Sequence, residues 1–153
     1  MRVSRFFLSS HLIRGESGAS AVEFALVLPV LVALLTGIID LGALAWKKME
    51  VQGAARAGAN YALVNATKGF DANLVAAAAT SATNLPVTFP EQPKKEFGCP
   101  NETTGITAVA NNTTLCSNGT VPGSYVTVRT STIYTPIWFN TVSLSATAKV
   151  RIS

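Results

Sequence analysis

Few side chains in this sequence have the type and spacing that catalysis requires. The only histidine, His11, stands near the N-terminus. The acidic residues after residue 65 are dispersed over predicted loops: Asp71, Glu91, Glu96 and Glu102. The segment 53–58 has glycines but lacks the strand-glycine-helix context of a nucleotide fingerprint. Because catalysis needs a nucleophile with a base, paired carboxylates, a metal cage or a phosphate cradle, the sequence predicts no enzyme, no cofactor and no small-molecule substrate.

The two cysteines, Cys99 and Cys116, are the remaining candidates for chemistry. If they are paired, the disulfide would restrict the unfolded chain by about 3 kcal/mol. A metal site is the alternative, but it lacks ligands, because His11 lies on the other side of the long apolar segment. Both cysteines follow a long apolar segment, where an oxidising compartment would permit a disulfide.

That apolar segment runs from Phe24 to Trp46, and Asp40 is its only charged residue. At about 1.5 Å per residue it is long enough to cross a hydrocarbon core of about 30 Å. A helix of a soluble protein needs a polar stripe that faces water, so the segment predicts a transmembrane helix, which Pro29 should bend or loosen. Asp40 is expected to lie close enough to the outer interface to be solvated, where Lys47 could meet it.

The flanking charges say little about orientation, because basic residues stand on both sides of the apolar segment. The cysteine pair favours a cytoplasmic N-terminus and an extracytoplasmic C-terminal part. A net charge of +4 could suggest nucleic acid. The basic residues are scattered and form no face with interleaved aromatics, so nucleic-acid binding is not expected.

Helical signals continue beyond the span, and one helix is predicted from about Ser20 to Asn65, because the stretch is rich in alanine and long-chain residues. Its outer part carries small residues, Gly53 to Ala59, that permit close helix packing. This face packs on the protein's own C-terminal domain, on neighbouring subunits, or on both at different heights, and these alternatives stay open. A second helix is predicted from an Asp71 N-cap to about Thr83.

The last part of the sequence is predicted to form a small sheet. Four prolines predict a loop from Leu85 to Pro100. Strands are expected at Ile106–Ala110, Tyr125–Tyr134 and Ser143–Ile152, the last with clean alternation of apolar and polar residues. The fold class is therefore α+β: one long N-terminal transmembrane helix that continues outside the membrane, a short second helix and a small C-terminal antiparallel sheet that lays its apolar face on the helix.

The stretch Arg14–Phe24, R-G-E-S-G-A-S-A-V-E-F, precedes the apolar segment, and the motif QGAARAGANYA follows at 52–62. Together these segments resemble the TadE family of tight-adherence pilus assembly proteins over roughly the first 65 residues. The glycine, the glutamate five residues on, the phenylalanine, the proline and the late acidic residue occur together in order. The C-terminal part matches only loosely.

The resemblance implies that the span lies in a bacterial inner membrane, where a prepilin peptidase cuts after Gly18 and leaves Ala19 as the new N-terminus. Glu23 and Phe24 then become assembly residues, and the Glu23 carboxylate meets the terminal amine of a neighbouring subunit. Glycine is expected to keep the scissile backbone extended. The alternative for Glu23 is a carboxylate that only reaches the headgroups. The resulting division is a leader at 1–18, a pilin-like helix at 19–66 and an extracytoplasmic domain at 67–153.

Three functions remain open from the sequence. The first is a minor pilin or pseudopilin whose partners are membrane lipid, the prepilin peptidase, other pilin subunits and the assembly machinery. The second is a secreted binding domain cut after Ala43–Ala45, although the apolar segment is longer than a secretory signal requires. The third is a permanent membrane assembly factor. The N-x-S/T patterns at Asn101, Asn112 and Asn118 are interpreted as polar turns.

Overall fold

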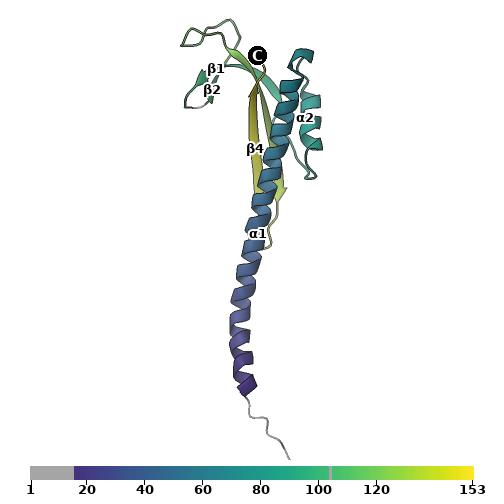
Figure 1. Ribbon diagram of the computed structural model, residues 1–153, viewed down its shortest axis with the longest axis vertical. Helices are drawn as coiled ribbons and strands as arrows, with labels where there is room; N and C mark the ends of the chain where they lie inside the picture. Colours follow the sequence, from purple (N-terminus) through teal and green to yellow (C-terminus); the bar gives the residue numbers. More distant parts are fainter. Residues whose placement is uncertain (1–15, 104) are drawn as a thin grey trace, which may run out of the picture. The chain divides into compact units, whose positions relative to one another are not determined.

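The structure, a computed structural model, describes residues 16–103 and 105–153 (Figure 1). His11, Arg14 and most of the predicted leader lie outside the described residues. The chain divides into two compact units, 1–38 and 39–153. The elements follow in the order α1 (Glu16–Val64), the short 3-10 helix η1 (Ala66–Lys68), α2 (Ala72–Ser81), β1 (Lys94–Asn101), β2 (Gly105–Val109), β3 (Gly123–Tyr134) and β4 (Val142–Arg151).

The described part of the first unit is the beginning of α1, which is apolar on all sides. Its large side chains are exposed around the whole circumference, from Val22 to Ile38. Pro29 lies inside the helix, which continues through it. Thr36 donates its hydroxyl to the carbonyl oxygens of Val32 and Ala33, so the polar group is satisfied within the helix.

The second unit combines the rest of α1 with α2 and a sheet. The four strands are all antiparallel and lie in the order β2-β1-β3-β4. The long hairpin of β3 and β4 pairs from Tyr125 with Arg151 to Tyr134 with Val142, and Figure 1 shows it beside α1. Alternation in β4 buries Leu144 and Ala146 against the helix. The predicted α+β fold class is thereby confirmed.

The predicted loop from Leu85 to Pro100 is wrong in its second half, because β1 begins at Lys94. Pairing explains how the strand accepts its proline. β1 pairs with β3 through Lys94–Gly98 and with β2 through Phe97–Asn101. Pro100 therefore has a neighbouring strand on one side only, which is the edge position that a residue without an N–H tolerates.

The small residues of α1 pack on the protein's own sheet and second helix. Val51, Ala54, Ala55 and Ala59 are buried, whereas Gly53 on the opposite side is exposed. One core cluster joins Val51 and Ala55 to the end of the β3–β4 hairpin, and a second joins Ala59 to α2 and the start of β3. Intramolecular packing is thus confirmed for the buried residues of this stretch, and packing on neighbouring subunits stays a prediction for the exposed Gly53.

Two polar side chains fix these packed elements through hydrogen bonds with the backbone. The Asp71 carboxylate accepts hydrogen bonds from the backbone N–H groups of Asn73 and Leu74, at 2.8 and 3.3 Å, so the predicted N-cap of α2 is confirmed. On β3, the buried Thr130 hydroxyl donates to the carbonyl oxygen of Val51 at 2.9 Å. This bond locks the centre of the sheet to α1.

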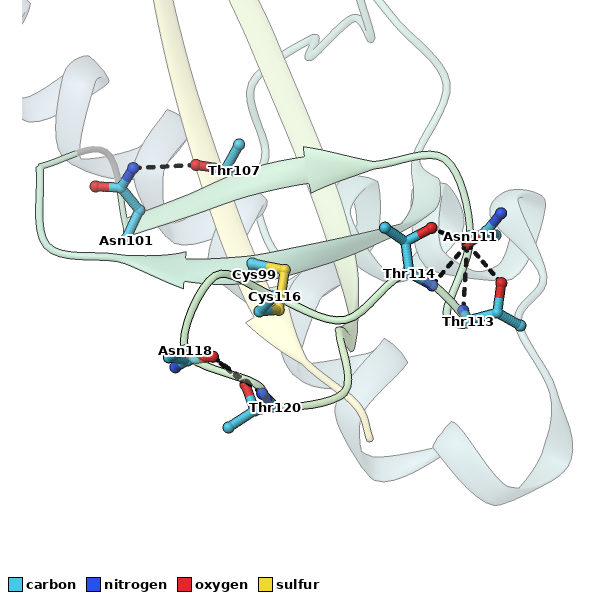
Figure 2. The surroundings of a disulfide bond; sticks show 9 residues. All are labelled: Cys99, Asn101, Thr107, Asn111, Thr113, Thr114, Cys116, Asn118 and Thr120. Atoms are coloured by element: carbon cyan, nitrogen blue, oxygen red, sulfur yellow. Dashed lines mark hydrogen bonds between the residues drawn. A yellow bond between two sulfur atoms is a disulfide. The ribbon is translucent and has the colours of Figure 1, made fainter.

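Cys99 and Cys116 form a disulfide that joins β1 to the loop after β2 (Figure 2). Around it, asparagines make local turns. The side-chain oxygens of Asn101 and Asn118 each accept from the backbone N–H two residues later, and Asn111 accepts from two successive N–H groups. These are Asx turns, as the N-x-S/T patterns at Asn101 and Asn118 predicted. At the third pattern the capping side chain is that of Asn111, one residue before the predicted Asn112.

Candidate membrane span and assembly site

One helix in the described ranges is long and apolar enough to cross a membrane. It runs through Gly18–Val64, and its most apolar stretch has a mean hydropathy of 2.5 with none of that stretch buried. A helix with apolar side chains on every side has no face suited to water. Residues 18–35 are exposed throughout, so this stretch needs an apolar surrounding, and the helix is suited to be an N-terminal membrane anchor.

Gly18 and Ala19 lie in the first turn of α1, which begins at Glu16. The expectation of an extended backbone at the proposed scissile bond is therefore wrong for this structure. The first N–H groups of a helix have no partner within it, so the first turn opens at low cost. A Cβ placed on Gly18 would meet nothing within 4 Å. No packing inside the described chain explains why this position carries glycine.

Glu23 and Phe24 stand at the start of the apolar segment, and both are exposed. Among residues 16–103 and 105–153, no cation forms a salt bridge with the Glu23 carboxylate. The structure brings Gly18, Ala19, Glu23 and Phe24 together only as neighbours along one helix. Their roles in processing and assembly therefore stay predictions.

Asp40 is buried, with 3% of its surface exposed, so the expectation of a solvated carboxylate is wrong. Its oxygens accept hydrogen bonds from the backbone N–H groups of Ile137, at 3.0 and 3.1 Å, and Trp138, at 3.1 Å. The Tyr134 hydroxyl lies 3.4 Å from the carboxylate. Two N–H donors and a hydroxyl offset the cost of burying this charge.

Lys47 does not meet Asp40 in this arrangement. Its ammonium nitrogen lies 4.8 Å from the centre of the Tyr134 ring instead, at a distance suited to a cation–π contact. Burial raises the pKa of Tyr134, and the charge of Asp40 and its hydrogen bond raise it further. Tyr134 thus remains a neutral donor at physiological pH.

The contact between Asp40 and the β3–β4 loop is the site that sequence reasoning missed. The signal was an acidic residue in an apolar helix, which usually faces a partner. Nothing near Asp40 in the sequence identifies that partner, which lies 97 positions later at Ile137. A second signal was the apolar run Pro136–Phe139, because it follows the predicted strand Tyr125–Tyr134 where polar turn residues would be expected.

Comparison with known proteins agrees with the resemblance drawn from the motifs. The sequence model of the family described as TadE-like protein matches residues 18–60. The match begins at the proposed processing glycine, includes the whole apolar segment and ends on the small-residue face of α1. It does not reach α2 or the sheet. No curated protein and no solved structure matches the chain.

Proposed function

We propose that this protein is a membrane-anchored minor pilin or pseudopilin that takes part in the assembly of a tight-adherence pilus and in surface adherence. The observation that carries the proposal is the family match at 18–60, on a helix whose first part has no covering within the described chain. Such a helix anchors the subunit in a membrane before assembly and packs on other apolar helices within a fibre.

The proposed topology places the N-terminus in the cytoplasm and residues after Trp46 outside the inner membrane. The disulfide between Cys99 and Cys116 supports this side, because oxidising compartments maintain such bonds whereas the cytosol reduces them. The charges that flank the span do not decide the orientation.

Processing would proceed at the first turn of α1. The peptidase opens this turn and cuts after Gly18, which leaves the ammonium group of Ala19 near the membrane surface. The free Glu23 carboxylate then pairs with the terminal ammonium of a neighbouring subunit. In a low-dielectric surrounding such a pair interacts far more strongly than in water. It would therefore fix how far one subunit is shifted along the fibre axis relative to its neighbour.

Sequencing the N-terminus of the protein purified from its own membrane tests this pathway. Ala19 as the first residue supports processing by a prepilin peptidase, whereas Met1 would indicate an unprocessed anchor. Gly18→Leu should leave a full-length precursor in the membrane, because the larger side chain crowds the peptidase. Gly53→Leu is the matched control: its Cβ also meets nothing within 4 Å, and it should be cleaved normally.

The role of Glu23 is tested separately from cleavage. Glu23→Ala should lower the number of pili more than it lowers membrane insertion, since loss of the charge makes the helix more apolar. Cleavage is also expected to weaken, because Glu23 lies only five residues after Gly18, close to the bond that the peptidase cuts. Glu23→Asp should be milder. If Glu23→Ala gives normal pili and normal cleavage, Glu23 has no assembly role, and its carboxylate only reaches the headgroups.

A secreted domain cut after Ala45 is the weaker candidate, and a specific contact opposes it. Such a cut would remove Asp40, whose carboxylate holds two backbone N–H groups of the sheet domain, and would leave those donors unpaired. Trp46 as the first residue in the sequencing experiment would nevertheless establish that product. A permanent assembly factor shares the anchor, and absence of the chain from sheared pili would favour it.

A further inference from the structure

The loop between β3 and β4, residues 135–141, exposes three consecutive large apolar side chains. The exposed fractions are 71% for Ile137 and 61% for both Trp138 and Phe139. Water is an unfavourable surrounding for such a cluster, and exposed apolar patches commonly mark contact with a membrane or a partner. Beside it lies an apolar hollow of about 300 Å³, lined by Asp40, Leu41, Leu44, Pro136, Phe139 and Val142.

The loop is fixed against the outer end of the apolar segment of α1. The Asp40 carboxylate binds the N–H groups of Ile137 and Trp138, and Leu41 and Leu44 share the hollow with Phe139. These three helix residues belong to the last turns of the segment 24–46. A membrane that contains this segment therefore reaches the level of the loop.

The backbone of the first three residues of the tip, 136–138, is suited to an apolar surrounding. In lipid, every backbone N–H must find a partner within the protein, because no water is available. Pro136 has no N–H, and those of Ile137 and Trp138 both bind Asp40. This gives a reason for an acidic residue in an otherwise apolar segment: its carboxylate accepts from the N–H groups of Ile137 and Trp138, which lie between β3 and β4 and have no strand partner.

We propose that the tip Pro136–Phe139 enters the outer leaflet at its interface and forms a second lipid contact of this protein. Trp138 would join Trp46, which is also exposed, in an interfacial belt, since indole rings favour the headgroup level. Lys47, above the Tyr134 ring, lies at the same level and matches anionic headgroups. The inference rests on the membrane span of the proposed function but not on its role in pili.

Tryptophan fluorescence of the full chain in phosphatidylcholine liposomes tests the tip. The chain has two tryptophans, so Trp46→Phe leaves Trp138 as the only reporter and Trp138→Phe leaves Trp46. Lipids brominated near the headgroup end of their chains should quench Trp138 at least as strongly as Trp46. Acrylamide in the water should quench Trp138 weakly.

The matched control is Leu115→Trp in a chain that lacks both natural tryptophans. Leu115 is 62% exposed and lies beside the disulfide, at the end of β3 opposite the tip. Its tryptophan should be quenched by acrylamide and not by brominated lipid. If Trp138 behaves like this control, the tip lies in water and the inference is wrong.

The other outcomes also have distinct meanings. Protection of Trp138 from both quenchers would show that protein covers the tip, and would overturn the lipid assignment. If Trp46 is quenched by lipid and Trp138 is not, only this inference fails, whereas loss of lipid quenching at Trp46 would overturn the span and the proposed function with it.

A variant of Asp40 tests how the tip is held. Asp40→Ala should weaken lipid quenching of Trp138 and increase its quenching by acrylamide, because two N–H groups lose their acceptor. Asp40→Asn keeps one acceptor oxygen and should cause a smaller change. Unchanged quenching in Asp40→Ala would contradict the positioning role of this carboxylate.

Discussion

Gly58 should be the least replaceable small residue of α1, because it lies where the helix meets both α2 and the sheet. A Cβ at this position would stand 3.1 Å from the Ala79 Cβ, 3.1 Å from the Val75 carbonyl oxygen and 3.2 Å from the Val128 Cγ1. These distances are shorter than ordinary contacts of about 3.5 to 4.0 Å. These neighbours belong to α2 and β3, so a shift of α1 away from one of them brings the new Cβ closer to the other.

The magnitude follows from two opposing effects. Replacement of glycine by alanine inside a helix stabilises it by about 1 kcal/mol, and overpacking of a filled core costs about 1 to 3 kcal/mol. Gly58→Ala should therefore lower the free energy of unfolding by about 0 to 2 kcal/mol. Gly53→Ala is the matched control on the same helix, because its Cβ meets nothing within 4 Å, and it should gain about 1 kcal/mol.

The assay is urea unfolding of the full chain in detergent, followed by near-ultraviolet circular dichroism of the packed tyrosines. Because the helix-propensity gain is common to both variants, the difference between them equals the overpacking cost, about 1 to 3 kcal/mol. An equal increase in the free energy of unfolding for Gly58→Ala and Gly53→Ala would refute the reasoning, since it would mean that α2 moves away from α1 without loss of stability. Gly58→Leu should then also fold, whereas tight packing predicts that it does not.

Three further predictions concern the C-terminal domain, residues 67–153. Cys99→Ser and Cys116→Ser should lower its abundance about equally, and native protein should resist thiol alkylation; free thiols at both positions would disprove the bond in the cell. The Thr127 hydroxyl, 2.6 Å from Glu96, and then a nearby lysine lower the pKa of Glu96. The Glu96 carboxylate should therefore stabilise the fold above its unfolded-state pKa of about 4.5, and this stabilisation should be lost as the pH falls through the lower folded-state pKa. The urea midpoint of Glu96→Gln should not show this loss at low pH. A pH profile equal to that of the unmodified protein would contradict the prediction. Reporter fusions after Asn65 should be active only as extracytoplasmic reporters, and cytoplasmic reporter activity there would reverse the topology.

Local sequence patterns were sufficient to predict α1 and β4, because α1 has a dominant apolar and alanine-rich composition and β4 has a clear alternation of apolar and polar residues. The alternation in Ser143–Ile152 predicts the buried side of β4 as observed. β1 had no such pattern: glycine and proline stand near its end, and the strand exists because β2 and β3 pair with it. Tertiary pairing overrides local preference in such strands, so the predicted loop failed there.

The candidate site was predictable only where its residues lie close together in the sequence. The motif from Gly18 to Phe24 could be found by inspection, because its spacing is local. The contact of Asp40 with the β3–β4 loop could not, since its two sides meet only after the sheet has packed on α1. An acid in an apolar helix indicates the need for a partner without indicating its position.

Loss of Asp40 and loss of Glu23, two of the acidic residues on α1, should therefore have different effects on stability. Asp40 is satisfied within the described chain by N–H groups of Ile137 and Trp138, so Asp40→Ala should lower the unfolding midpoint of the purified protein in detergent. Glu23 has no salt-bridge partner in residues 16–103 and 105–153, so Glu23→Ala should leave that midpoint unchanged. A carboxylate near an apolar layer stays charged only with a partner or water. If Glu23→Ala alters the midpoint as much as Asp40→Ala, its partner lies within the chain, and the pairing proposed between subunits loses its basis.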